Sequence, residues 1–227
     1  MKHQVPYITI GGVDLLEPFT VLTDLLIAAV CFYAFFKLRN EKYRGYVYTF
    51  FKVFFFSMGV ANVIGGVIGH GFLYIWGQEA KIPGWYVSMI SVASFERAAI
   101  LHAKPLMKRN IGNFFSVLNI VELLTFMTLA FIFVKFIFVE IHAIYGLLVV
   151  VFSFELFVLR KTKDEGCVFI MFGVFLAAVS AILHAFRVSV NIWFNYNDVA
   201  HLGMAAAMWC FYKAAVTIKM HRHVHAQ

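Results

Sequence analysis

Residues 167–190 read CVFIMFGVFLAAVSAILHAFRVSV, a stretch in which no charged residue occurs before Arg187. A helix that crosses a bilayer needs about 20 predominantly apolar residues, and this stretch supplies them. Similar stretches occur along the rest of the chain, and the seven expected helices cover residues 18–38, 48–75, 83–102, 113–134, 140–160, 167–190 and 196–217. The sequence therefore predicts an all-α, polytopic membrane protein, whose 227 residues form a single seven-transmembrane-helix bundle.

The composition excludes a soluble globular protein. Hydrophobic residues make up 62% of the chain and charged residues 14%, whereas soluble domains contain about 45–50% and about 25%. The net charge of +7 does not indicate a nucleic-acid partner, because the basic residues lie in short loops between apolar stretches. Membrane lipids are the expected partners, and the oligomeric state stays open.

The basic residues also predict the orientation. They gather in every second loop and in the tail, at Lys37, Arg39, Lys42, Arg44, Lys104, Lys108, Arg109, Arg160, Lys161, Lys163, Lys219 and Arg222. Cytoplasmic loops carry an excess of lysine and arginine, so we expect this side to face the cytoplasm. An odd number of helices then places the N-terminus outside and the C-terminus in the cytoplasm. The expected location is a bacterial cytoplasmic membrane or an equivalent cell membrane.

Ionisable side chains share one depth in the outer half of five expected helices. They are Asp24, His70, His184 and His201, with His142 and Asp198 slightly closer to the surface. Counting at about 1.5 Å per residue places this layer roughly 8–10 Å below the outer surface. Ionisable residues inside a membrane are costly and mark functional sites, and a catalytic zinc ion takes three protein ligands and keeps one open position. The layer predicts a zinc site with ligands drawn from His70, His142, His184 and His201. A structural or proton-relay network is the alternative.

A smaller polar group is expected closer to the cytoplasm. It contains Glu96, Arg97 and Glu155, with Glu122 near the middle of the fourth expected helix. A buried guanidinium needs a counter-charge, so Arg97 is predicted to pair with Glu155 or Glu96. We expect His102 to lie at the cytoplasmic interface without a partner, and the tail histidines His221, His223 and His225 to be solvated.

Two segments resemble a known family. His70 lies near the end of the second expected helix, and Asn197-Asp198-Val199-Ala200-His201-Leu202 opens the seventh. These segments and the helix count are similar to the CREST superfamily of seven-helix membrane hydrolases, which includes the alkaline ceramidases and the adiponectin-receptor proteins. The resemblance implies a zinc ion held by one histidine of helix two and two of an HxxxH motif on helix seven. Asn197 stands at the first histidine of that motif and Gly66 at an expected serine, so His184, His142 or Asp198 would complete the ligand set.

The resulting functional expectation is a zinc-dependent intramembrane hydrolase of a lipid amide or ester. Asn197 would donate to the oxyanion of the reacting acyl group, and Asp198 or Asp24 would move protons. Two histidines at equal depth can also hold haem iron from both sides, so a b-type haem electron-transfer protein is an alternative. A non-enzymatic sensor or transporter that uses the layer as a ligand or proton site is another.

Overall fold

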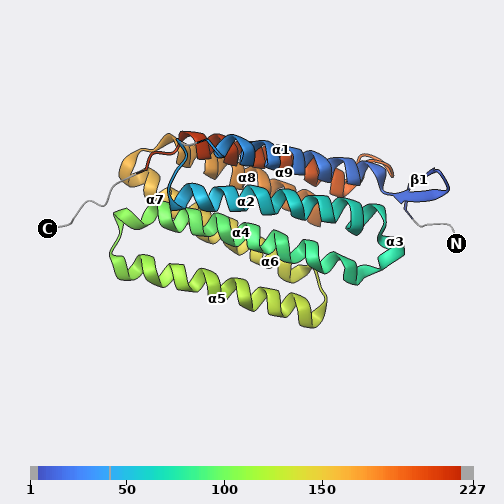
Figure 1. The fold of residues 1–227 in the computed structure, drawn as a ribbon, viewed down its shortest axis with the longest axis horizontal. Helices are drawn as coiled ribbons and strands as arrows, with labels where there is room; N and C mark the ends of the chain where they lie inside the picture. The colour runs from blue at the N-terminus through green and yellow to red at the C-terminus, as the bar shows by residue number, and fades with distance from the viewer. Residues whose placement is uncertain (1–4, 41, 221–227) are drawn as a thin grey trace.

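The computed structural model describes residues 5–40 and 42–220, which form a helical bundle with a small hairpin at one end. The hairpin pairs β1 (Tyr7–Ile10) with β2 (Val13–Leu16) in antiparallel register. The helices are α1 (Pro18–Leu38), α2 (Tyr46–Ile64), η1 (Gly65–Gly71), α3 (Leu73–Trp76), η2 (Gln78–Lys81), α4 (Ile82–Ala103), η3 (Lys104–Leu106), α5 (Arg109–Phe133), α6 (Ile137–Ile144), η4 (Tyr145–Val151), α7 (Phe152–Thr162), α8 (Glu165–Ala185) and α9 (Tyr196–Thr217). The long helices lie side by side along one direction (Figure 1).

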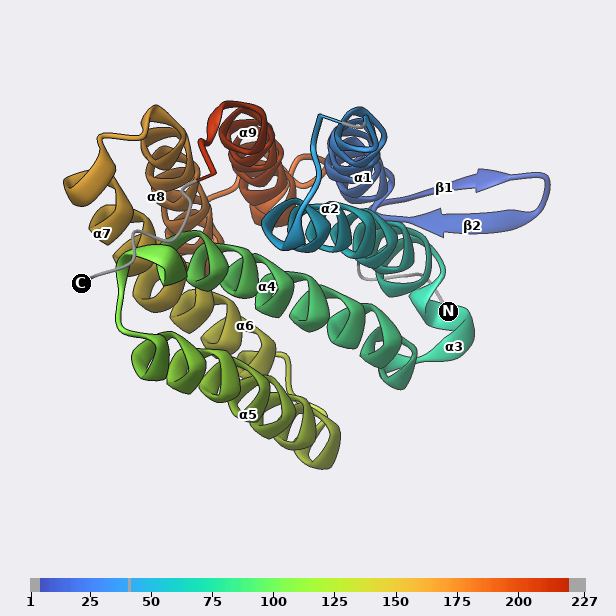
Figure 2. The same ribbon diagram turned by 60° about the vertical axis from the view of Figure 1, so that its left-hand side comes forward.

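The prediction of an all-α membrane protein is confirmed. Within the part of the chain that the structure describes, six helices are long and apolar enough to cross a membrane: α1, α2 with η1, α5, α6 to α7, α8 and α9. Helix α4 has the same length but carries Glu96 and Arg97. It lies between α2 and the pair α5 and α6 (Figure 2), so its polar side chains meet protein rather than lipid. The expected number of seven spans would require α4 to cross the membrane as well, which a helix with polar side chains turned toward protein can do.

Several observed helix ends differ from the expected ones, and at two places an expected helix is shortened or broken. The sixth expected helix, 167–190, ends at Ala185 in α8, because Arg187 takes a left-handed backbone with φ 52°. The second, 48–75, is broken at Phe72, whose φ of −121° separates η1 from α3. The hairpin was not predicted, since its residues form no long apolar stretch.

Two π-helical segments widen the backbone where acidic side chains approach it. Helix α2 continues into η1, and η4 joins α6 to α7. A Cβ atom added to Gly66 in η1 would lie 2.8 Å from Asp24 Cβ, and one added to Gly146 in η4 would collide with the carboxylate of Glu96. Such π segments are frequent at functional sites, and here glycine lets each carboxylate pack against the backbone.

The centre of the bundle is aromatic. The ring of Phe95 on α4 lies 4.6 Å from Phe54 on α2 and 4.6 Å from Phe211 on α9, measured between ring centroids. All three side chains are at most 1% exposed. Packed aromatic pairs add to the free energy gained by burying their area. This contact fixes α2, α4 and α9 relative to one another.

The orientation is testable by cysteine labelling. We expect Glu79→Cys to react with a membrane-impermeant maleimide in intact cells, and Lys108→Cys to react only after permeabilisation, since the basic loops should face the cytoplasm. Both positions are exposed. The unsubstituted chain is the background control, because Cys31 and Cys167 are buried and Cys210 is half-buried. The reverse labelling pattern would overturn the orientation.

Candidate functional site

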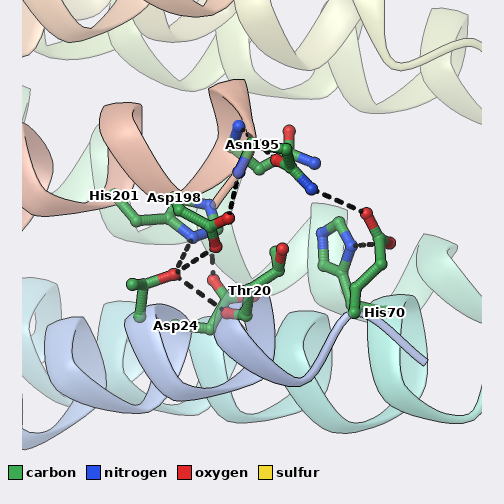
Figure 3. Close-up of polar contacts among 9 residues, drawn as sticks. Thr20, Asp24, His70, Asn195, Asp198 and His201 are labelled. Carbon is green, nitrogen blue, oxygen red and sulfur yellow. Dashed lines mark hydrogen bonds and ion pairs between the residues drawn. The ribbon is translucent and has the colours of Figure 1, made fainter. Parts of the chain in front are cut away.

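Three helices bring together the polar residues at the hairpin end of the bundle. Asp24 comes from α1, His70 from η1 and His201 from α9, and α1 packs against both other elements. Figure 3 shows the side chains of Asp24 and His201 facing each other between the two helices, with His70 beside them. The ring centroids of His70 and His201 lie 6.3 Å apart. Of the residues expected in the outer layer, these three lie together.

Hydrogen bonds determine which nitrogen of His201 carries the proton. Its Nδ1 lies 3.0 Å from Thr23 Oγ1, and that hydroxyl also contacts the carbonyl oxygen of Thr20 and Asp198 Oδ1. The last two atoms can only accept, so the hydroxyl donates to one of them and accepts from His201 Nδ1–H. This assigns a lone pair to His201 Nε2, which lies 3.6 Å from Asp24 Oδ1.

His70 has the same tautomer for a different reason. Its Nδ1 lies 2.8 Å from Glu17 Oε2, and Glu17 Oε1 accepts from the side-chain amide of Asn195 at 3.2 Å. Burial raises the pKa of Glu17, but the hydrogen bonds from His70 and Asn195 and the charge of Lys81 lower it by more, so the pKa is below its usual 4.5. An ionised Glu17 accepts the proton on Nδ1 and leaves the lone pair on His70 Nε2.

The backbone at Glu17 is unusual in a way that serves this contact. Its φ of 42° is left-handed, a conformation uncommon for residues other than glycine. Its amide donates to the carbonyl oxygen of Pro6 at 2.8 Å, so the hairpin holds the strained residue. Backbone strain of this kind concentrates at functional sites. The hairpin thus fixes the carboxylate that orients His70.

Two buried oxygens at the site lack a partner. Asp24 is 5% exposed and Thr20 is 1% exposed, yet Asp24 Oδ2 and Thr20 Oγ1 have no hydrogen-bond partner among residues 5–40 and 42–220. A buried polar atom without a partner costs about 1–3 kcal/mol. Such atoms beside two histidine lone pairs indicate a site that a ligand completes.

Asp198 has a structural position rather than the predicted catalytic one. Its Oδ2 accepts from the backbone amide of Asn195 at 2.6 Å, and the Asn195 side chain accepts from the amide of Asn197 at 2.8 Å. This capping box begins α9. Because Asp198 Oδ1 contacts Thr23, both carboxylate oxygens are engaged in holding α9 and the Thr23 hydroxyl. Asn197 is half-buried in the first turn of α9.

The other two predicted ligands lie elsewhere. His184 is 34% exposed, with Nδ1 3.7 Å from Glu140 Oε1 and its ring 5.2 Å from that of Tyr196. His142 is fully buried on α6, where it contacts Glu122 and the carbonyl oxygen of Met89. The expectation that His142 joins His70 and His201 is wrong, because α6 packs against α4 and α5 rather than against α1.

Tighter polar clusters occur deeper in the bundle. Among the described residues, two groups of three or more potential ligands have their atoms within 4.8 Å of one another: Glu96, Glu122 and His142, and His102, Glu155 and Cys167. Neither includes the outer histidines. The outer trio is wider, so its side chains would have to move toward one another to coordinate one ion.

The inner polar residues correct two expectations. The predicted ion pair of Arg97 is wrong: Nε donates to Asn119 Oδ1 at 3.0 Å and a terminal nitrogen to the carbonyl oxygen of Ser116, and no pair with a carboxylate is found in the described part of the chain. The expectation that His102 lies at the cytoplasmic interface without a partner is also wrong. It is 1% exposed, with Nδ1 3.1 Å from Glu155 Oε2 and Nε2 3.7 Å from Asp164 Oδ2.

Sequence reasoning missed four site residues, namely Glu17, Thr20, Thr23 and Asn195. A signal existed for Thr20 and Thr23, since both are polar residues close to Asp24 on a helix that is otherwise apolar. The contacts of Glu17 and Asn195 depend on the unpredicted hairpin and on the loop before α9. The tail histidines His221, His223 and His225 lie outside the described residues.

Gly66→Ser should disturb the site. The added Cβ would lie 2.8 Å from Asp24 Cβ, so we expect about 1–3 kcal/mol of destabilisation from overpacking and a displaced Asp24 carboxylate. Gly65→Ser is the matched control, because a Cβ there meets nothing within 4 Å. Thermal unfolding in detergent measures the difference, and equal stabilities of the two variants would contradict the close packing of Gly66 on Asp24.

Comparison with known proteins assigns the chain to one protein family. Neither a curated protein nor a solved structure matches the chain. One family profile matches residues 19–220, which include the whole of the site except Glu17. The chain therefore belongs to DUF6962, a family of unknown function.

Proposed function

We propose that the protein is a zinc-dependent intramembrane hydrolase of a lipid amide or ester, with His70, His201 and Asp24 as zinc ligands. One observation carries the proposal: two imidazole Nε2 lone pairs, assigned by separate hydrogen bonds, lie beside a carboxylate with an unpartnered buried oxygen. The ligand set differs from that expected from the sequence, since Asp24 takes the place of His142 and His184.

The donor types fit zinc, although His70 has to move toward Asp24 and His201 to bind the same ion. Catalytic zinc binds imidazole nitrogen and carboxylate oxygen at about 2.0–2.2 Å, which separates two ligand atoms by roughly 3.3 Å in a tetrahedral site. His201 Nε2 and Asp24 Oδ1 are 3.6 Å apart. Zinc-bound histidines usually donate their second N–H to a carboxylate or another acceptor. Glu17 accepts from His70, and Thr23 accepts from His201.

The chain's own residues have separable tasks in hydrolysis. Zinc in such a site, when bound, lowers the pKa of a water ligand toward about 7. Thr20 Oγ1, buried and unpartnered, is placed to hydrogen-bond a water or a substrate oxygen next to Asp24. Asp24 Oδ2 can hold the proton released there and return it to the leaving group. Asn197, at the start of α9, is the candidate donor to the oxyanion.

A lipid is the substrate class that fits the location. The side chains of His70 and His201 are 21% and 20% exposed, so the site is accessible although it lies within the spanning segments. Leu22 and Phe19 on the neighbouring surface of α1 are 61% and 44% exposed, as expected of side chains that face lipid tails. If the N-terminus is outside, as the basic loops predict, the site would lie in the outer leaflet of the membrane, within reach of the acyl linkage of a lipid.

A proton relay or ligand sensor is the second candidate. The contacts from Asp198 through Thr23 and His201 to Asp24 form a continuous chain, which can move a proton without hydrolysis. A b-type haem is less well supported, because Asp24 lies 3.6 Å from His201 Nε2, where the macrocycle of an axially ligated haem would have to lie.

The proposed activity is tested with purified full-length protein in phospholipid nanodiscs. Zinc-loaded and chelator-stripped samples are incubated with an N-acyl amino alcohol and with a phospholipid ester, and released fatty acid is measured by mass spectrometry. We expect release from one substrate class, lost after chelation and restored by zinc. Zinc bound at the site without release from either class would reject the hydrolase and favour the sensor.

A further inference from the structure

A second polar cluster lies in the interior, away from the outer site. Glu96 on α4, Glu122 on α5 and His142 on α6 are 0%, 8% and 0% exposed, and each offers a ligand atom within 4.8 Å of the other two. Three helices thus direct ionisable groups to one point in the bundle. Charged groups in such a position are retained only with partners or a function.

The hydrogen bonds of His142 leave one nitrogen directed at a carboxylate. Its Nε2 lies 3.0 Å from the carbonyl oxygen of Met89, which can only accept, so this nitrogen carries a proton. Nδ1 lies 2.5 Å from Glu122 Oε1. Because Nε2 carries the proton of a neutral imidazole, the short contact requires a second proton between Nδ1 and Glu122 Oε1. A metal ion that binds both atoms would replace this proton and separate the two atoms to roughly 3.3 Å.

The two carboxylates are only partly satisfied. Glu96 Oε2 accepts from the Asn119 side chain at 3.2 Å, but Glu96 Oε1 and Glu122 Oε2 are buried and have no hydrogen-bond partner among the described residues. Arg97 is on the same helix, yet its guanidinium donates to Asn119 and Ser116. The unpaired oxygens call for a further positive ligand.

The surroundings of the two carboxylates leave room for a small ligand. A cavity of about 10 Å³ is lined in part by Glu96, Asn119 and Tyr145, close to the volume that holds a single water. Gly146 in the π-helical segment η4 lets the Glu96 carboxylate approach the backbone, since a Cβ there would collide with it. Of the three clustered residues only Glu96 lines this cavity, so the space beside the Glu96 carboxylate fits a small ion or a water and not an organic ligand.

We infer that Glu96, Glu122 and His142 bind one divalent transition-metal ion. Two carboxylates and a divalent cation sum to zero charge, which lowers the cost of the cluster in a low-dielectric interior. Mixed imidazole and carboxylate donors suit zinc, manganese or iron, whereas calcium takes six to eight oxygens. The Met89 carbonyl and the Asn119 amide orient His142 and Glu96, as outer partners of metal ligands do.

The neighbouring cluster of His102, Glu155 and Cys167 does not require a bound metal ion. There Glu155 contacts His102 at 3.1 Å, and Asp164 lies 3.7 Å from the same ring. A protonated His102 between two carboxylates satisfies that cluster without an added ion.

The experiment measures metal content and uses residues separate from the outer site. Purified protein is stripped with a chelator, dialysed against micromolar zinc and analysed by inductively coupled plasma mass spectrometry. We expect about two zinc ions per chain for the unsubstituted protein, and about one for the Glu96→Gln/Glu122→Gln variant. Glu140→Gln, on the same helix as His142 but 34% exposed, is the matched control and should retain about two.

A second measurement does not depend on changing the buried glutamates. The His70→Ala/His201→Ala variant lacks the outer ligands and should keep about one ion, with a zinc-edge absorption spectrum showing one imidazole and otherwise oxygen at about 2.0–2.2 Å. Loss of all zinc in that variant, or retention of full zinc content by Glu96→Gln/Glu122→Gln, would overturn the inner site. The first of these results leaves the outer site intact, so the two proposals can fail separately.

Discussion

His201→Ala is expected to remove zinc from the outer site and to lower zinc-dependent lipid hydrolysis by more than about 100-fold. Substituting a residue that only hydrogen-bonds to a metal ligand already lowers metal affinity or activity by about 10–100-fold. His201 is proposed as a ligand itself, so a larger loss is expected. Its Nε2 faces Asp24 at 3.6 Å, and its ring lies 6.3 Å from that of His70. Activity and zinc content, measured on the same purified sample, should fall together.

His184→Ala is the control for this prediction. His184 belongs to the same polar layer by depth, but it is 34% exposed and pairs with Glu140. It should keep both zinc and activity within about twofold, as surface substitutions usually have small effects. If His184→Ala lost zinc and His201→Ala kept it, the ligand assignment would be wrong.

His102→Ala is expected to have the largest effect on stability, about 3–5 kcal/mol. His102 is 1% exposed and lies between Glu155 and Asp164, which are buried as well. Removing the cation would leave two buried carboxylates uncompensated, the situation in which breaking a buried pair is most costly. The measurement is unfolding in mixed detergent micelles, with His184→Ala again as the exposed histidine control. Equal stability of the two variants would contradict the ion-pair description.

The same network predicts a pH dependence. Burial raises the pKa of Asp164, but hydrogen bonds from His102 and from the amides of Lys219 and Gly166 lower it by more, so it stays below its ordinary 3.8. A lowered folded pKa contributes stability above 3.8 that is lost as the pH falls through the lower folded value. His102→Ala should therefore reduce the loss of stability on acidification below pH 4.

The helices could be predicted from the sequence because a bilayer requires long apolar stretches. Helix α9 occupies the expected residues 196–217, and α1 the expected 18–38. The depth of each side chain below the membrane surface could also be predicted, since helix rise is constant. Counting residues along the helices placed Asp24, His70 and His201 in one layer.

The direction of each side chain around the bundle could not be predicted, because depth does not determine which helices are neighbours. His142 was expected close to the layer of His70, but it lies on α6, which packs against α4 and α5. Asp198 has the right position on α9, but its carboxylate caps the helix. Glu17 contacts His70 from a left-handed backbone at the end of the hairpin, and neither the hairpin nor this backbone conformation could be predicted from the residue types.

The most direct test of the central claim is an anomalous difference map, recorded at the zinc absorption edge from crystals of the zinc-loaded, full-length protein. The account predicts a peak at about 2.0–2.2 Å from His70 Nε2, His201 Nε2 and an oxygen of Asp24. Crystals that show zinc elsewhere in the chain and no peak between these three side chains would contradict it.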